Sequence, residues 1–135
     1  MTYAHTHRVR YHETDAQSYL FNSRYLEIAD VAMTEFFRHL GWSYADLNAH
    51  GVDPSVVSAQ LSFRAPAFFD DDLVFDVACA RVGRTSFELE HTVTRNGEQL
   101  AGINIVYVNV DATEAAPRPL PADVAEALTR HRSTS

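Results

Sequence analysis

The clearest hydrophobic pattern in the chain is a run of apolar residues at three- and four-residue steps between positions 23 and 40. This spacing places the apolar side chains on one face of an α-helix and the charged ones on the other. Asn22 or Ser23 can cap the first turn, and Gly41 follows the basic last turn as a stop signal. The sequence therefore predicts one long amphipathic helix over residues 23–40.

After residue 56 the apolar residues recur at every second position, which is typical of β-strands. Segments 57–64, 73–80 and 87–94 predict strands, the first with one buried face, and the nearly continuous apolar run 100–110 predicts a central strand. Asn96 and Gly97 form a strong two-residue hairpin signal. Residues 6–11 predict a fifth strand, and a short helix is expected at 122–130 after the proline-rich segment 117–121.

One long helix followed by four strands joined through short turns predicts an α+β fold in a single domain, residues 1–135. The five-stranded sheet is expected to be curved and mostly antiparallel, so that it wraps the helix and buries both apolar faces. Its edge strands would remain open to pairing with a second copy of the chain.

Composition narrows the classes of protein. No apolar stretch of the 135 residues approaches the ~20 needed to span a membrane, and the first residues have no apolar signal-peptide core. The formal net charge of −7 argues against nucleic-acid binding, which needs a basic surface. Cys79 is the single cysteine, so intramolecular disulfides are excluded. We expect a cytoplasmic protein that binds neither nucleic acid nor membrane.

The polar segment 11–22 ends where the long helix begins and carries the main candidate for chemistry, Asp15. Unpaired N–H groups at a helix N-terminus carry partial positive charge and can hold the oxygen of a polarised carbonyl while a carboxylate acts on its carbon. Asp15 therefore indicates a minimal hydrolase site. The alternative is a turn residue that bonds nearby backbone. Glu13 is expected to be solvated.

Other catalytic classes find little support. The chain has no Gly-x-Ser-x-Gly motif and no glycine-rich phosphate loop, which argues against serine hydrolases and nucleotide-binding folds. His5, His7 and His12 lack partners at zinc-site spacing and are interpreted as surface histidines. Cys79 lies on the apolar side of its strand and is expected to be inert. No metal or other cofactor is predicted.

Three segments, residues 9–15 with 22–25, residues 63–71 and residues 118–121, together resemble the hot-dog fold thioesterases, specifically the 4-hydroxybenzoyl-CoA thioesterase-like acyl-CoA hydrolases. Their order and spacing match across nearly the whole chain. The resemblance implies that the protein hydrolyses an acyl-CoA to a free acid and CoA. It also implies a homodimer or homotetramer with active sites at the subunit interface.

The resemblance assigns the catalytic carboxylate to Asp15 and the polarising backbone N–H to the helix start at Asn22. At Ser18 the chain departs from the family pattern, which usually has glycine three residues after the aspartate. Glycine suits a tight backbone path, so Ser18 bears on the geometry of this loop. Whether Asp15 attacks the carbonyl or deprotonates a water is left open.

The resemblance also implies the substrate contacts. The partner subunit's Val57, Ser58 and Ala59 would line the acyl pocket, and Arg81 and Arg84 would meet the phosphates of CoA. From the residues themselves, the aromatic set Tyr19, Phe21, Phe68 and Phe69 indicates either an aromatic or medium-length acyl group or simply structural packing. Two other functions remain within the same fold, a hydratase or dehydratase acting on a thioester and a non-catalytic acyl-thioester or lipid-binding module. A carrier protein remains the alternative to CoA as the thioester donor.

Overall fold

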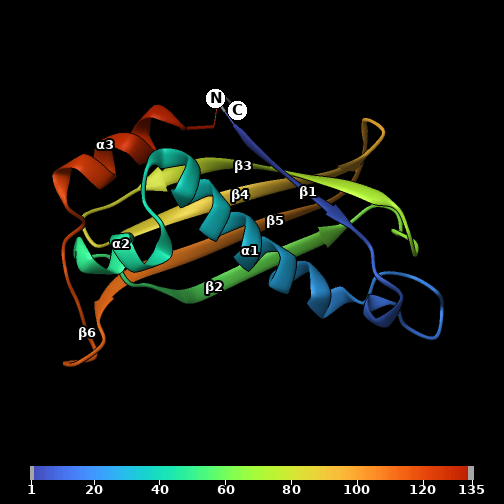
Figure 1. Ribbon diagram of the computed structural model, residues 1–135, viewed down its shortest axis with the longest axis horizontal. Helices are drawn as coiled ribbons and strands as arrows, with labels where there is room; N and C mark the ends of the chain where they lie inside the picture. The colour runs from blue at the N-terminus through green and yellow to red at the C-terminus, as the bar shows by residue number, and fades with distance from the viewer. Residues whose placement is uncertain (1, 134–135) are drawn as a thin grey trace.

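The computed structural model describes residues 2–133 as a long helix laid across a curled antiparallel sheet (Figure 1). Helix α1 spans Asn22–Leu40, α2 spans Tyr44–Ala49 and α3 spans Ala122–Arg130, and a 3₁₀ turn, η1, covers Tyr11–Glu13. The strands are β1 (Tyr3–Arg8), β2 (Pro54–Phe63), β3 (Asp72–Val82), β4 (Ser86–Arg95), β5 (Glu98–Asp111) and β6 (Ala116–Pro117). No helix within the described part of the chain is long and apolar enough to cross a membrane.

The sheet runs in the order β1-β3-β4-β5-β2, with every pair antiparallel, and the short β6 adds to β5. This arrangement confirms the predicted α+β class with one long helix and five long strands. The expectation that short turns make successive strands neighbours is wrong for β2 and β3. Segment 64–71 carries the chain from one side of the sheet to the other, so β2 becomes an edge strand beside β5.

Helix α1 begins one residue before the predicted start, and its capping differs from the expectation. The N-cap is Phe21, which has no side-chain acceptor, so Asn22 and Ser23 lie inside the first turn and cap nothing. The first-turn N–H groups of α1 therefore have no side-chain cap. The predicted end of helix α1 is confirmed, because Gly41 at its C-cap adopts the left-handed conformation with φ 117°.

The core lies between α1 and the central strands. The apolar face predicted for the helix is buried, and the rings of Phe37 and Phe87 contact each other edge to face at 5.7 Å between centroids. On β3 the alternating residues Leu73, Phe75 and Val77 are fully buried under the helix. Cys79 is buried in the same row, and burial raises the pKa of its thiol, which agrees with an inert role.

Strand β2 does not bury the face that its alternation predicts. Phe63 is 50% exposed although it pairs with the buried Ala101, and Val57, at the β-bulge between Val56 and Ser58, is 59% exposed. The physical reason is position, because α1 covers the middle of the sheet while β2 lies at its edge. Alternation gives the direction of a side chain but not what covers it. The apolar edge of β2 is thus open in the single chain.

Two further local structures differ from the prediction. Strand β1 ends at Arg8 rather than at Tyr11, because the backbone N–H of Arg10 bonds the carboxylate of Glu13 and the chain turns into η1. Helix α2 was not predicted, since six residues give too little periodicity. Its start follows a familiar rule, because the Ser43 hydroxyl accepts the N–H of Asp46 at 3.1 Å.

Candidate active site

Backbone hydrogen bonds hold the side chain of Asp15 in a tight turn. Its Oδ1 accepts the N–H groups of Gln17 at 2.9 Å and Tyr19 at 3.2 Å, and its own N–H donates to the carbonyl of Tyr19 at 2.9 Å. The turn interpretation is therefore confirmed, and it does not conflict with a chemical role. Both side-chain hydrogen bonds that the described residues make to this carboxylate use Oδ1, which leaves Oδ2 as the oxygen available to a substrate.

Ser18 lies at the sharpest point of this turn. Its φ of 66° is in the left-handed region, and its N–H donates to the carbonyl of Asp15 at 2.9 Å. A residue with a Cβ pays roughly 1–2 kcal/mol for this conformation. The backbone path thus explains why glycine suits this position, and the chain adopts the path with serine in place.

Glu13 anchors the Asp15 turn to its surroundings. Its Oε1 accepts the N–H of Arg10 at 2.6 Å and lies 2.9 Å from Nε2 of His7, while its carbonyl accepts the N–H of Phe21 at 2.9 Å. The expectation that Glu13 is solvated is wrong, because only 8% of the residue is exposed. Burial alone would raise the pKa of Glu13, but these hydrogen bonds leave it below its usual value.

A second loop, segment 64–71, forms the opposite wall of the site. The N–H of Leu20 donates to the carbonyl of Ala67 at 2.8 Å, and the rings of Tyr19 and Phe68 meet edge to face at 5.5 Å. Arg95, the last residue of β4, also fixes this loop, because its side chain donates to Asp71 at 2.7 Å and to the carbonyl of Pro66 at 3.2 Å. The two loops are thus joined by both backbone and side-chain contacts.

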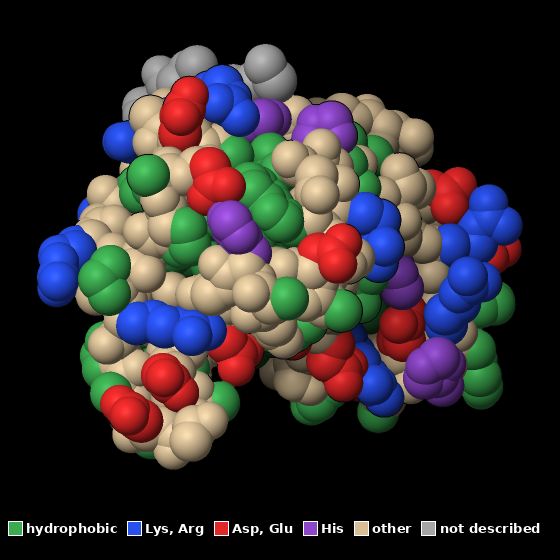
Figure 2. All heavy atoms as spheres, turned by 60° about the vertical axis from the view of Figure 1, so that its left-hand side comes forward, with side chains coloured by type: hydrophobic (Ala, Val, Ile, Leu, Met, Phe, Trp, Pro, Cys, Tyr) green, Lys and Arg blue, Asp and Glu red, His purple; other side chains and the backbone are tan. Residues whose placement is uncertain are grey.

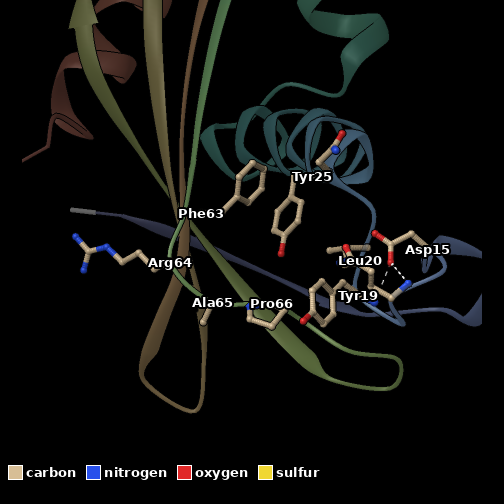
Figure 3. Close-up of a pocket in the computed structure, with 10 residues that line it drawn as sticks. Asp15, Tyr19, Leu20, Tyr25, Phe63, Arg64, Ala65 and Pro66 are labelled. Atoms are coloured by element: carbon tan, nitrogen blue, oxygen red, sulfur yellow. Dashed lines mark hydrogen bonds between the residues drawn. The ribbon is translucent and has the colours of Figure 1, made fainter.

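Between the loops and the start of α1 lies a cavity of about 330 Å³. It brings together three residues predicted from the sequence, Asp15, Tyr19 and Asn22. Figure 3 shows Asp15 at one side of the cavity and the rings of Tyr25 and Phe63 facing each other at another. The remaining lining comes from Gln17, Leu20, Arg64, Ala65 and Pro66.

The other predicted contacts lie elsewhere in the chain. Val57, Ser58 and Ala59 are on the exposed edge strand β2 and do not line this cavity. Arg81 and Arg84 lie at the opposite end of β3 from the Asp15 loop, about 30 Å away at roughly 3.3 Å per strand residue. Figure 2 brings that side of the molecule forward, and on it basic side chains are interspersed with acidic ones. All five contacts stay predictions.

Sequence reasoning missed the other residues of the cavity lining, among them Tyr25, Phe63 and Arg64. Tyr25 was predicted as helix core, and its ring does pack on Phe63 at 5.1 Å between centroids, but it also forms cavity wall. Burial raises the pKa of Tyr25, so its hydroxyl stays neutral. The available signal was the end of the alternating run just before Pro66, where a strand stops and side chains become free to line a site.

The comparisons with known proteins agree with this architecture. The family model of the thioesterase-like superfamily matches residues 9–128. The acyl-CoA thioester hydrolase YbgC of Escherichia coli O157:H7 is 29% identical, over 87% of this chain and 88% of the relative. The 1,4-dihydroxy-2-naphthoyl-CoA hydrolase of Nostoc punctiforme is 26% identical, over 98% and 90%.

The same agreement holds for solved structures. The solved structure of BH1999, a gentisyl-coenzyme A thioesterase, superposes with a TM-score of 0.83 at 26% identity. The match covers 94% of this chain and 99% of that structure's chain. The hot-dog fold expected from the three sequence segments is thereby confirmed.

Proposed function

The chain belongs to the thioesterase-like superfamily, and we propose that it is an acyl-CoA thioesterase, which hydrolyses an acyl-CoA to a free acid and CoA. One observation carries this proposal. The carboxylate of Asp15 and the start of α1 at Asn22 line the same cavity. A carboxylate and a set of helix N-terminal donors are the two groups that thioester hydrolysis needs.

The start of α1 supports a role in holding the thioester carbonyl. Because Phe21 at the N-cap offers no side-chain acceptor, the first-turn N–H groups have no side-chain competitor for a substrate oxygen. As the carbonyl carbon becomes tetrahedral, its oxygen gains negative charge, and these donors stabilise that charge. The donor is a backbone group, so the identity of the side chain at Asn22 matters less than its position.

Asp15 then acts on the carbonyl carbon through its free oxygen. Either this oxygen attacks the carbon and forms a mixed anhydride that water later hydrolyses, or it takes a proton from the attacking water. Both routes consume one water in forming the acid product, and CoA leaves as the thiolate. The thiolate is a good leaving group, with a free thiol pKa near ~8.5, so a strong general acid is not required.

The lining of the cavity favours an aromatic acyl group. Tyr19, Tyr25 and Phe63 present ring faces and edges on which another ring can pack. Two relatives carry names of thioesterases for aromatic acyl-CoA substrates, the dihydroxynaphthoyl and gentisyl derivatives. We take an aromatic acyl-CoA as the substrate class of this chain.

The site is completed in an oligomer. The exposed edge of β2 includes Val56 and Val57, at 53% and 59% exposure, and it offers unpaired backbone groups to a second copy. Pairing there brings the partner subunit's Val57, Ser58 and Ala59 against the acyl group. Arg81 and Arg84 contribute to a site only across such an interface.

The proposal is tested by thiol release from a panel of CoA thioesters, comparing benzoyl-CoA with acetyl-CoA and decanoyl-CoA. The expected result is hydrolysis with the highest kcat/KM for the aromatic substrate. A non-catalytic binding module would bind these thioesters without releasing thiol. Absence of thiol release from every CoA thioester by the folded protein would therefore contradict the proposal.

A further inference from the structure

Arg64 lies at the junction of two cavities. It follows the last residue of β2, and its backbone N–H donates to the carbonyl of Leu100 at 2.8 Å. Besides the Asp15 cavity, it lines a second hollow of about 320 Å³, which we call the Arg64 trough. Figure 3 shows its side chain directed away from Asp15, whereas the ring of the preceding Phe63 faces Tyr25. This opposition follows from strand alternation.

The Arg64 trough is hollow because a glycine lies on β5 where other strand residues have side chains. Gly102 pairs with Ser62 on β2 and Thr92 on β4. A Cβ at this position would meet Nε2 of Gln99 at 3.7 Å, an ordinary contact. A Cβ is therefore sterically tolerated there, and a longer side chain would extend into the hollow. The rest of the lining is mostly polar and comprises Gln60, Leu61, Ser62, Gln99 and Asn104.

Arg64 is also a cation without a carboxylate partner among the described residues. Many arginines of the chain are paired, as in the contacts of Arg8 with Asp72 at 2.9 Å and Arg95 with Asp71 at 2.7 Å. No other Lys or Arg lines either cavity within the described part of the chain. In a protein of net charge −7, an anionic ligand needs a local cation where its charge docks.

We propose that Arg64 and its trough bind the phosphate-bearing arm of the acyl-CoA while the acyl group occupies the Asp15 cavity, an assignment that rests on the proposed thioesterase function. The flexible thiol arm of CoA passes Arg64 at the end of β2, and the guanidinium meets the phosphates. Amide groups of Gln60 and Gln99 offer hydrogen bonds along this path. Asn104 donates to Glu88 at 2.8 Å, which leaves its carbonyl oxygen free to accept from the amides of the arm.

The test combines two variants that alter the trough in different ways. Arg64→Gln removes the charge, and Gly102→Leu fills the hollow while keeping the arginine. Arg130→Gln on α3 is the matched control, since Arg130 is an exposed arginine that pairs with Glu126. Free CoA and pantetheine, which lacks the nucleotide phosphates, are titrated by calorimetry. KM and kcat are measured with benzoyl-CoA and with the short benzoyl thioester of N-acetylcysteamine.

Arg64→Gln is expected to weaken CoA binding and raise KM for benzoyl-CoA about tenfold, because a charged hydrogen bond to phosphate is lost. kcat, pantetheine binding and the short thioester should be unaffected, and the effect should shrink as salt rises. Gly102→Leu should weaken the binding of both CoA and pantetheine, because the new side chain fills the path of the pantetheine arm. Arg130→Gln should change neither.

Unchanged CoA binding by Arg64→Gln would overturn the assignment, as would an equal loss on the short thioester. A selective loss in Arg64→Gln, with CoA and pantetheine binding unchanged in Gly102→Leu, would overturn the part assigned to the trough. If the wild-type protein releases thiol from neither thioester, the proposed function fails, and the calorimetry with CoA still decides the assignment of Arg64.

Discussion

Asp15 and Tyr19 are joined twice, once by the N–H of Asp15 to the carbonyl of Tyr19 at 2.9 Å and once by the N–H of Tyr19 to Oδ1 of Asp15 at 3.2 Å. The pair closes the turn and fixes the direction of the carboxylate. The ring of Tyr19 in turn packs on Phe68 in the opposite loop. The orientation of the proposed catalytic group is therefore set by backbone bonds rather than by another titratable side chain.

Ser18→Gly is expected to stabilise the protein. The left-handed φ of 66° costs a residue with a Cβ, and the gain is partly offset because glycine has a more flexible unfolded state. The net effect is about 0.5–1 kcal/mol in the free energy of unfolding, measured by urea denaturation. Ala16→Gly in the same loop is the control and should destabilise. Equal destabilisation by both variants would contradict the strain at Ser18.

His91 on β4 makes the protein sensitive to acid. It is 1% exposed, and neither ring nitrogen has a hydrogen-bond partner among the described residues. Burial, together with the charge of nearby His5, lowers the pKa of His91 from 6.5 to about 4. The unfolded chain therefore binds the proton more readily, and the stabilisation held above pH 6.5 is lost as pH falls toward 4.

His91→Leu should remove this loss, since leucine has similar volume and no titratable group. Urea unfolding between pH 7.5 and 4.5 should show a smaller decline for His91→Leu than for the wild type. His12→Gln, which changes an exposed histidine, should keep the wild-type decline. The same pH dependence in His91→Leu and wild type would refute the role of His91.

The exposed edge of β2 is expected to form the subunit interface. Light scattering after size exclusion should show a dimer or tetramer at micromolar concentration, and Val57→Lys should shift it to monomer and abolish activity. Val31→Lys, at an equally exposed valine on α1 (51% against 59%), should do neither. An active monomer of the wild-type chain would contradict a site shared between subunits.

Arg81 and Arg84 are expected to act across that interface and to add to the phosphate contact proposed for Arg64. Replacing both with Ala should raise KM for benzoyl-CoA several-fold with little change in kcat, because the phosphates bind alike in the ground and transition states. Mixing this variant with Asp15→Asn protein creates hybrid oligomers in which one site has both intact parts. Activity at low substrate should then exceed the sum of the separate variants, and the absence of such a gain would show that the arginines do not act in trans.

The long helix and the hairpin turn were predictable because they depend on the order of apolar, polar and turn residues within one short stretch of sequence. Seven apolar positions define α1, and Asn96 and Gly97, with φ of 51° and 83°, form the predicted hairpin turn. The exposure of β2 was not predictable, since it depends on how far α1 reaches across the sheet. The burial of Glu13 depends on His7 from a separate strand, which spacing alone does not reveal.

The residues of the candidate site also fall into some that the sequence could predict and some that it could not. Asp15 and Asn22 are seven positions apart and could be read from one segment, whereas Phe63 and Arg64 come from a strand about forty residues later. Their contact with the Asp15 cavity follows from the path of segment 64–71, which returns to pair with Leu20. The alternating run of segment 57–64 indicates where the strand ends, before Pro66, but not which loop the following residues contact.

The most direct measurement is the turnover of Asp15→Asn on benzoyl-CoA. The amide keeps an oxygen that can accept the N–H groups of Gln17 and Tyr19, so the turn should persist, but it can neither attack a carbonyl nor take a proton. The account predicts a fall in kcat of at least ~100-fold with the folded structure retained, and no fall for Asp46→Asn at an exposed position of α2. Unchanged thiol release by folded Asp15→Asn protein would contradict it.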